Sequence, residues 1–375
     1  MLENLFTKIF QSYLVPWYKG LEDPVGTQEE TLRRLLQTYS ATQYGTTHNA
    51  ENIEDIDDFR HEFPKLTYQE IEGLLEHVKR GNHRVFLAEP PKSWVMTRGS
   101  TGDPKILPAT KTHLEEIMIC GSRALLNYLK RNPETKLGKI LNLSFPSRVA
   151  KIEVEDEPTD YGYSSGTYSR THPSLGDAIL VPSQVEIDRL GPGIRKIDWK
   201  NRFELIYEKA SEDEIFAAIG VAPVILSFAR HMKRVHGELP RDRWNLNAIF
   251  STSVRKIQNR YAPLFEKYYG NISTIEIYSA TEGVFAQQLD NLPYITPNYD
   301  RYLFEVETGS GLKMLHELRR GEWGRLIVST TMFPRYDIGD MIEAMGKGYF
   351  RVFGRAKLTH ILEHRLYRIF YGAFL

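Results

Sequence analysis

The chain has 375 residues, of which 41% are hydrophobic and 26% are charged, as in ordinary globular proteins. Lys plus Arg and Asp plus Glu number 48 each, so the formal net charge is zero, which argues against a protein that binds duplex nucleic acid. The single cysteine, Cys120, excludes a disulfide or a thiolate metal site within one chain. No apolar run approaches the ~20 residues of a membrane span, and the first residues lack the layout of a signal peptide. We therefore expect a cytoplasmic protein that binds neither nucleic acid nor membrane.

The predicted elements begin with a helix near the N-terminus, where apolar residues from Leu2 to Trp17 recur at helical spacing. Capping-box pairs predict helix starts at Thr27 with Glu30, Thr67 with Glu70, Thr112 with Glu115 (running to about Asn132), and Ser211 with Glu214. Strand-like segments are residues 85–88, 140–144, 248–251, 273–278, 303–307 and 326–330. Helices and strands alternate, which favours an α/β fold. Residues 151–175 are first acidic and then rich in Gly, Ser and Tyr, which predicts a long surface excursion that is either a lid or a plain insertion.

The segment MTRGSTGDPK, Met96 to Lys105, concentrates hydroxyls, glycines and a lysine in one run. A plain turn needs one or two such residues, whereas an anion held by backbone N–H groups, hydroxyls and a lysine needs most of them. The spacing is neither that of a Walker A motif nor G-x-G-x-x-G. Taken alone, the run is also compatible with a solvent-exposed loop that contains an incidental lysine.

Three later segments extend this pattern. Tyr278 to Glu282, YSATE, follows a strand-like segment and so places a carboxylate at the C-terminal end of a strand, where open α/β sheets bind ligands. Arg335 to Asp340, RYDIGD, follows another strand-like segment, and 353-FGRAK-357 comes next. Each segment alone is weak, because a glutamate after a strand is more often a cap and an aspartate after glycine is usually turn chemistry.

In combination, these segments resemble the adenylate-forming superfamily. Thr97 to Lys105 looks like its phosphate loop, Tyr278 to Glu282 its Y-G-x-[TS]-E segment, Tyr336 to Asp340 its Y-R-x-G-D segment, and Gly354-Arg355 the G-R pair before its hinge. Residues 59–81 and 105–110 are similar to the corresponding parts of the auxin-responsive acyl acid amido synthetase family. The resemblance covers roughly residues 50 to 357.

The resemblance implies an α/β fold of the adenylate-forming type, with stacked sheets flanked by helices and a small β-rich subdomain. This large N-terminal domain is expected over residues 1–354. Residues 355–375 are expected to be a short remnant of the hinge region, without the usual small C-terminal domain. Within that remnant, apolar residues at helical spacing predict a helix that packs on the body or on a partner chain: Leu358, Ile361, Leu362 and Leu366.

The resemblance also implies a function: an ATP- and Mg²⁺-dependent ligase that activates a carboxylic acid as an acyl-adenylate and transfers the acyl group to an amine or amino acid. A partner chain that supplies the missing domain is a further expectation. Two alternatives stay open. In the first alternative, the acceptor of the acyl group is the thiol of CoA or of a carrier. In the second, the chain is a non-catalytic nucleotide-binding relic.

Site residues follow from the resemblance by position. The expected catalytic residues are Lys105, Thr101 and Glu282, with Glu282 as the Mg²⁺ ligand. The expected nucleotide-binding residues are Thr97, Arg98, Gly99, Ser100, Thr101, Gly102, Lys105, Tyr278, Ser279, Ala280, Thr281, Asp340 and Arg355. Among these, Asp340 is expected to accept the ribose hydroxyls and Tyr278 to contact adenine.

The acid substrate is expected to contact Ser253, Val254 and Arg123, with Arg123 as a carboxylate clamp. Ordinary loop residues, and a solvated helix charge in the case of Arg123, are the alternatives. Three features depart from the family pattern: Arg98 in place of serine, Asp337 in place of a basic or neutral residue, and Ser279-Ala280 at the start of the second motif. The histidines form no H-x-x-x-H pair, so the sequence predicts no zinc site.

Overall fold

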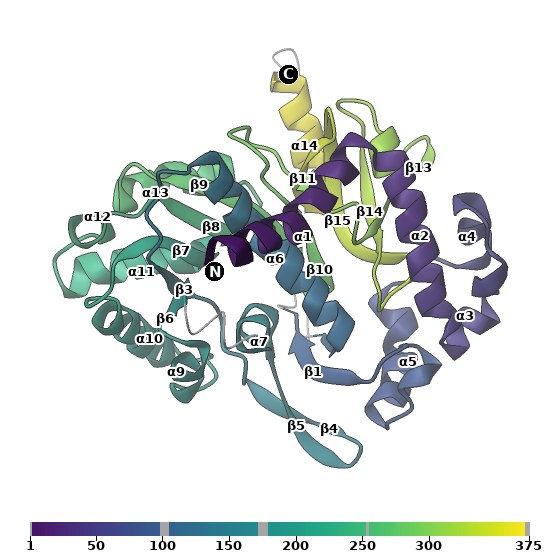
Figure 1. Ribbon diagram of the computed structural model, residues 1–375, viewed down its shortest axis with the longest axis horizontal. Coiled ribbons are helices and arrows are strands. Elements are labelled where there is room, and N and C mark those ends of the chain that lie inside the picture. The colour runs from purple at the N-terminus through teal and green to yellow at the C-terminus, as the bar shows by residue number, and fades with distance from the viewer. Residues whose placement is uncertain (1, 98–104, 172–178, 253–254, 372–375) are drawn as a thin grey trace. The chain divides into compact units, whose positions relative to one another are not determined.

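The computed structural model describes residues 2–97, 105–171, 179–252 and 255–371, which form two compact units (Figure 1). Unit 1 comprises Met1–Val78, Arg84–Ala88 and Tyr294–Leu375, and unit 2 comprises Lys79–His83 and Glu89–Pro293. Both units pack helices on sheets, so the predicted α/β class is confirmed. The predicted domain boundary at residue 354 stays a prediction.

Unit 2 contributes the strands β10-β9-β8-β7-β3-β6, in this order, to a largely parallel sheet; the pairings from β9 to β6 are parallel and that of β10 with β9 is antiparallel. These strands are β3 (Lys139–Leu143), β6 (Leu180–Val181), β7 (Ile215–Val221), β8 (Ala248–Thr252), β9 (Ser273–Ala280) and β10 (Gly283–Gln287). Its helices are α6 (Lys111–Arg131), α9 (Gln184–Arg189), α10 (Lys196–Lys209), α11 (Ala222–Val235), α12 (Pro240–Arg243), the π-helix η3 (Ile257–Tyr261) and α13 (Ala262–Tyr269).

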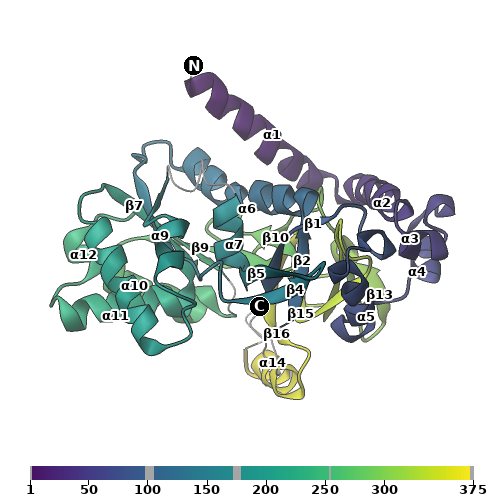
Figure 2. The same cartoon turned by 90° about the horizontal axis from the view of Figure 1, so that it is seen from below.

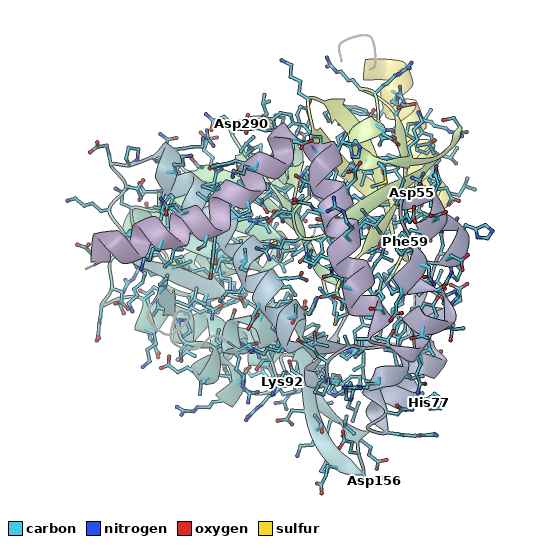
Figure 3. The ribbon with its side chains drawn as sticks, turned by 45° about the vertical axis from the view of Figure 1, so that its right-hand side comes forward. Asp55, Phe59, His77, Lys92, Asp156 and Asp290 are labelled. Carbon is cyan, nitrogen blue, oxygen red and sulfur yellow. The ribbon has the colours of Figure 1, made fainter. Side chains whose placement is uncertain are left out.

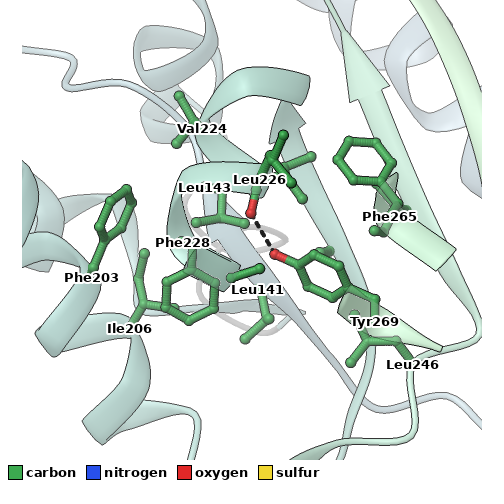
Figure 4. Close-up of a cluster of buried hydrophobic side chains, with 14 of the residues drawn as sticks. Leu141, Leu143, Phe203, Ile206, Val224, Leu226, Phe228, Leu246, Phe265 and Tyr269 are labelled. Carbon is green, nitrogen blue, oxygen red and sulfur yellow. Dashed lines mark hydrogen bonds between the residues drawn. The ribbon is translucent and has the colours of Figure 1, made fainter. Parts of the chain in front are cut away.

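A cluster of buried apolar side chains joins this sheet to α10, α11 and α13 (Figure 4). Leu141 and Leu143 of β3 pack with Phe203 of α10 and Phe228 of α11. Tyr269 of α13 enters the same cluster, where its hydroxyl donates to the Ile225 carbonyl at 2.6 Å and burial raises its pKa well above the usual value. The partnered hydroxyl lets this polar group be buried without an unsatisfied donor.

A smaller sheet of unit 2 has the order β2-β1-β5-β4, with β1 (Pro91–Met96), β2 (Ile106–Thr110), β4 (Ala150–Val154) and β5 (Glu157–Tyr163). Part of the predicted surface excursion is therefore the β4–β5 hairpin, followed by α7 (Ser164–Thr171). Glu155 and Asp156 form the turn at φ of 52° and 60°, the left-handed values that a two-residue hairpin turn requires. Figure 3 shows Asp156 at the tip of this hairpin.

Unit 1 contains an antiparallel sheet of order β13-β12-β14-β15-β16. The strands of this sheet are β12 (Leu303–Thr308), β13 (Gly311–Met314), β14 (Trp323–Ser329), β15 (Tyr336–Gly346) and β16 (Tyr349–Arg355). The unit also contains the short strand β11 (Thr296–Pro297), which is not part of this sheet. Its helices are α1 (Leu2–Glu22), α2 (Pro24–Ser40), α3 (Gln43–Thr47), η1 (Ala50–Asn52), α4 (Ile56–Glu62), α5 (Tyr68–Lys79), η2 (His83–Val85), η4 (Leu315–Glu317) and α14 (Leu358–Tyr371).

The helix expected after residue 355 is present as α14, which packs on β16 (Figure 2). The imidazole of His364 stacks on Phe353 with ring centroids 3.8 Å apart, and Arg368 donates to the Gly321 carbonyl at 2.8 Å. Leu358, Leu362 and Leu366 remain exposed along the helix.

The N-terminal helices are fastened to the C-terminal part of unit 1 by hydrogen bonds from buried polar side chains. Trp17 Nε1 donates to the Pro297 carbonyl at 3.1 Å, and Tyr39 donates to the Thr330 carbonyl at 2.6 Å. Gln28 Nε2 donates to the Tyr299 carbonyl at 2.8 Å. The predicted N-terminal helix is therefore present as α1, and its Trp17 attaches it to the body of unit 1.

Two predicted segments are wrong. Ser211 and Glu214 do not begin a helix, because residues 215–221 form β7, a central strand whose continuous apolar run is buried on both faces of the parallel sheet. Residues 85–88 form no strand; η2 ends at Val85, and the strand of this region is β1, six residues further on.

Two helix starts are shifted. α2 begins at Pro24 rather than near Thr27, because Asp23 caps it by accepting from the Gly26 amide at 3.0 Å. α6 is capped by Thr110, while the Thr112 hydroxyl donates to Glu89 at 2.7 Å instead. The predicted start at Thr67 is confirmed, with the Thr67 amide donating to Glu70 at 2.5 Å.

A buried ion pair ties β12 to the turn before β15. Arg335 donates to the two Glu305 oxygens at 3.0 and 3.3 Å, and its Nη1 reaches the carbonyls of Arg60 and Phe63 at 2.9 and 2.6 Å. Arg60 of α4 also contacts Glu305 at 3.0 Å. Figure 3 labels Asp55, the N-cap of α4, and the buried Phe59 of the same helix.

Glu305→Gln is expected to lower the free energy of unfolding of unit 1 by about 3–5 kcal/mol, because it leaves Arg335 buried without its counter-charge. Chemical denaturation followed by circular dichroism measures the change. The matched control is Glu307→Gln on the same strand, where the partner Lys65 is exposed and the expected cost is about 1 kcal/mol or less. Equal costs for the two variants would contradict this role of the buried pair.

Candidate functional site

The turn between β9 and β10 carries the predicted acidic residue. β9 ends at Ala280, which pairs with Gly283 at the start of β10, so Thr281 and Glu282 form the connection. Both side chains are buried, at 5% and 7% exposure. Because β9 runs parallel to β8, Glu282 lies at the carboxyl end of a parallel strand, as the sequence predicts.

Two side chains from other elements, the buried His113 and the half-buried Tyr168, hold this turn by its backbone. Tyr168 of α7 donates its hydroxyl to the Thr281 carbonyl at 2.7 Å. The imidazole of His113 on α6 also hydrogen-bonds the backbone of Thr281, and its Nε2 lies 3.5 Å from the Tyr168 oxygen. Sequence reasoning missed both residues, since no motif marks them and they meet only through tertiary packing.

Burial is the main cause of the pKa shifts of the two side chains that hold this turn. Burial lowers the pKa of His113 to about 4, against a smaller upward effect of its hydrogen bond to Thr281, so the imidazole is neutral at pH 7. Burial, and next the negative charge of Glu282, raise the pKa of Tyr168 well above its usual value. The negative charge of Glu282 therefore acts on the Tyr168 hydroxyl, and both His113 and Tyr168 are uncharged at pH 7.

Glu276, also on β9, is a second acidic residue that sequence reasoning did not single out. Burial raises its pKa to about 7. Its partner across the sheet is Ser251 of β8, whose buried hydroxyl has no hydrogen-bond partner among the described residues. A carboxyl group that titrates near neutral pH thus lies beside an unsatisfied hydroxyl.

The predicted phosphate loop connects β1 to β2. Thr97 follows β1, Lys105 precedes β2, and the Thr97 amide donates to the Lys105 carbonyl at 2.9 Å, which closes the base of the loop. The expected site residues between them lie outside the described residues: Arg98, Gly99, Ser100, Thr101 and Gly102. Ser253 and Val254 of the expected acid pocket lie outside them as well.

Arg123 is completely buried on α6, so the alternative of a solvated helix charge is wrong. Its Nη1 lies 3.8 Å from the thiol of Cys120, one turn earlier on the helix. Tyr278 is buried on β9, and Ser279 and Ala280 are half-buried at the end of that strand.

The remaining predicted site residues belong to unit 1. Asp340 of β15 and Arg355 of β16 are opposite each other in the sheet and form an ion pair at 3.2 Å. Asp337 accepts from the Gly339 amide at 2.9 Å and pairs with Arg325 at 3.2 Å. The structure therefore brings Asp340 and Arg355 together in unit 1, and Thr281 and Glu282 together with His113 and Tyr168 in unit 2.

Residues 18–179 match the sequence profile of the GH3 family N-terminal domain. The predicted resemblance to the acyl acid amido synthetases is confirmed. Among curated proteins, the chain is similar to the probable indole-3-acetic acid-amido synthetase GH3.1 of Arabidopsis thaliana, with 21% identity over 383 aligned positions that cover 85% of this chain. The chain spans 64% of that protein's length.

Solved structures show the same fold. The GH3 acyl acid amido synthetase AtGH3.15 in complex with 2,4-DB matches with a TM-score of 0.72 at 15% identity, covering 90% of this chain and 70% of that one. A 2-hydroxyisobutyryl-CoA ligase with 2-HIB-AMP and CoA matches with a TM-score of 0.61 at 13% identity, covering 90% and 70%. The predicted fold of the large N-terminal part of adenylate-forming enzymes is therefore confirmed. Within the described residues, no helix combines the length and apolar character needed to cross a membrane.

The buried histidine beside the Thr281 turn gives a pH-dependent stability. Between pH 6.5 and 4 the unfolded chain protonates His113 while the folded protein does not, so stability falls with falling pH by about 3 kcal/mol from this group. Denaturation of the wild type and of His113→Gln across this range measures the difference between their two profiles. Glu276 acts in the opposite direction in both proteins, because its raised pKa favours folding at low pH, so it cancels from the difference. Parallel profiles would show that His113 is not held neutral.

Proposed function

We propose that this chain uses ATP to activate a carboxylic acid as an acyl-adenylate and passes the acyl group to an amine, such as that of an amino acid. The similarity to the acyl acid amido synthetases supports this reaction class. The structural observation that carries the proposal is the buried carboxylate of Glu282 at the carboxyl end of β9, held by a turn whose backbone is fixed from α6 and α7.

In the first step, a carboxylate oxygen of the acid attacks the α-phosphorus of ATP, an oxygen–phosphorus bond forms, and pyrophosphate leaves with the electrons of the broken bond. In the second, the amine nitrogen attacks the acyl carbon, AMP leaves, and the nitrogen loses a proton. Two anions must meet in the first step, so the site has to supply positive charge and fixed donors. Lys105 supplies a point charge, and the loop from Thr97 to Lys105 supplies backbone N–H groups.

The residues present fit a magnesium ion. Mg²⁺ is bound through one or two carboxylates together with phosphate oxygens and water, and Glu282 offers such a carboxylate in a buried turn. When bound, Mg²⁺ neutralises phosphate charge. The chain's own contribution is to orient Glu282 through the Thr281 backbone, which Tyr168 and His113 hold.

Asp340 and Arg355 are proposed to bind the ribose. An ionised carboxylate is acceptor-only, so it suits the two hydroxyl donors of a ribose diol. The ion pair with Arg355 at 3.2 Å fixes one Asp340 oxygen in place before a ligand arrives. Arg123 is proposed as the carboxylate clamp of the acid substrate; its complete burial would strengthen a charge-assisted bidentate contact.

The thioester-forming ligase and the non-catalytic nucleotide-binding relic remain the competing functions, as does the requirement for a second polypeptide. Cys120 is buried and takes part in no disulfide within the chain, which is compatible with the proposed cytoplasmic location. Pyrophosphate exchange with a panel of carboxylic acids separates an enzyme from a relic. Amide formation by the purified chain, with amino acids or CoA as acceptors and with or without co-purified proteins, then separates the remaining alternatives.

Glu282→Gln keeps the shape of the side chain and removes its charge, so pyrophosphate exchange is expected to fall by about 100-fold, equivalent to ~2.7 kcal/mol of transition-state stabilisation. The matched control is Glu266→Gln on α13 of the same unit, which is exposed and should exchange at the wild-type rate. Equal rates in Glu282→Gln and the wild type would remove Glu282 from the site. Absence of exchange in the wild type with every acid, together with intact ATP binding by calorimetry, would favour the relic.

Asp340→Asn is expected to weaken adenine-nucleotide binding by ~1.5–3 kcal/mol, because asparagine offers one acceptor oxygen where the ribose diol needs two. Asp337→Asn removes the same charge three residues earlier and keeps an oxygen for the Gly339 amide, so it controls for the change in net charge and for the turn. Calorimetric titration with AMP measures both variants. Matching affinities for the two variants would argue against ribose binding by Asp340.

A further inference from the structure

A second group of chemically active side chains lies in unit 2, between α10 and the end of α11. Glu204 of α10 stands between two histidines, His231 of α11 and His236, which ends that helix. One Glu204 oxygen lies 2.6 Å from Nε2 of His231, and the other lies 2.9 Å from Nε2 of His236. One potential ligand atom from each of the three residues lies within 4.8 Å of the other two. None of these residues has a part in the proposed adenylation reaction.

The two histidine rings are held in place from outside the group. His231 is buried and packs against Phe203 of the core cluster, with ring centroids 5.4 Å apart. His236 is covered by Tyr207, which stacks on it at 3.7 Å with the ring planes 8° apart. Preorganised side chains of this kind lose little conformational entropy when they bind an ion.

The stacking tyrosine is itself anchored. The Tyr207 hydroxyl donates to Glu238 at 2.7 Å, and the Arg243 guanidinium lies over the Tyr207 ring at 4.3 Å while pairing with Glu238 at 3.1 Å. The orientation of the His236 ring is thus fixed by a network that does not use its Nε2. That nitrogen remains directed at Glu204.

We propose that Glu204, His231 and His236 form a Zn²⁺ site that clamps α10 to the end of α11. Two imidazole nitrogens and a carboxylate oxygen are a donor set that zinc takes in protein sites, with water in the fourth position. Ligand atoms of a tetrahedral zinc are ~3.3 Å apart. The contacts of 2.6 and 2.9 Å, which go to different oxygens of Glu204, therefore have to open, and ligand atoms that now lie up to 4.8 Å apart have to approach, each by small side-chain rotations. Glu204 and His236 are partly exposed, which leaves an entry path and room for the water.

Without metal, the same residues form a hydrogen-bonded group in which imidazole N–H groups donate to the Glu204 carboxylate. Zinc binding requires both Nε2 atoms to be deprotonated, so each ring carries its proton on Nδ1 instead. Nη2 of Arg234 lies 3.5 Å from Nδ1 of His231, at the limit of a hydrogen bond, and must turn away. Arg234 is exposed, so its side chain has the freedom to do so.

This site differs from the sequence-based prediction of no zinc site. The two histidines are five positions apart and only one of them lies within the helix, so no H-x-x-x-H spacing marks them. The third ligand comes from another helix, 27 positions before His231. Imidazole donors favour zinc and its late transition-metal neighbours over Mg²⁺, so this site and the proposed magnesium site select different ions.

The test uses the full chain, stripped with a chelator and titrated with Zn²⁺ by calorimetry. One zinc per chain with a dissociation constant of about 10 μM or tighter is expected, together with a higher melting temperature, since an ion that binds only the folded protein stabilises it. An excess of Mg²⁺ should leave the zinc titration unchanged. No zinc binding, or binding without any rise in melting temperature, would overturn the proposal.

The variants assign the ligands. His236→Gln and Glu204→Gln should each weaken zinc binding at least tenfold. The matched control His61→Gln removes an exposed histidine that also contacts a glutamate, Glu62, and should bind zinc like the wild type. Circular dichroism without metal checks folding, and if His236→Gln does not fold, Glu204→Gln decides, because its amide still hydrogen-bonds both histidines. Wild-type affinity in a folded Glu204→Gln protein would overturn the assignment.

Discussion

The buried pair of Arg335 and Glu305 is the contact around which unit 1 is organised. Burying two charges is costly, and it is tolerated here because the guanidinium also reaches two backbone carbonyls and the carboxylate also receives Arg60. The same turn exchanges backbone hydrogen bonds with Leu66, which donates to the Arg335 carbonyl at 3.0 Å and accepts from the Asp337 amide at 2.8 Å. The segment after α4 is thereby fixed to the start of β15, the strand that carries Asp340.

Local chemistry made part of the fold predictable. The pair of Thr67 and Glu70 indicates a helix start because both partners lie within one helical turn. Strands such as β9 are indicated by their content of β-branched residues. Ser211 with Glu214 has the same local pattern as Thr67 with Glu70, yet a strand follows it. The apolar run at residues 215–221 is ambiguous by periodicity, and its place between β3 and β8 decides the outcome. Sheet position is a tertiary property that a single segment does not contain.

The candidate site likewise contains residues whose position the sequence predicts and residues whose position it does not predict. The position of Glu282 was predictable because a strand is followed directly by a turn there, and the Asp340 and Arg355 motifs fall on neighbouring strands. His113, Tyr168 and the Glu204 group were not predictable, since their partners come from other helices and their pattern exists only after packing. Burial, rather than residue type, makes His113 a neutral hydrogen-bonding group instead of a cation. The sequence shows which ionisable side chains are present, and the packing of the folded chain determines which of them are charged.

The discontinuity of unit 1 has a consequence for the order of folding on the ribosome. Tyr39 and its acceptor Thr330 are 291 positions apart, and Trp17 and Pro297 are 280 apart. Unit 2 is nearly continuous in sequence, so all residues that form its contacts have been synthesised before the last strands of unit 1. At a synthesis rate of ~5–20 residues per second, α1 and α2 wait roughly 15–60 s for their partners. During that interval the apolar faces of α1 and α2 that later pack on the C-terminal strands are exposed to solvent, a hydrophobic surface that the finished protein buries.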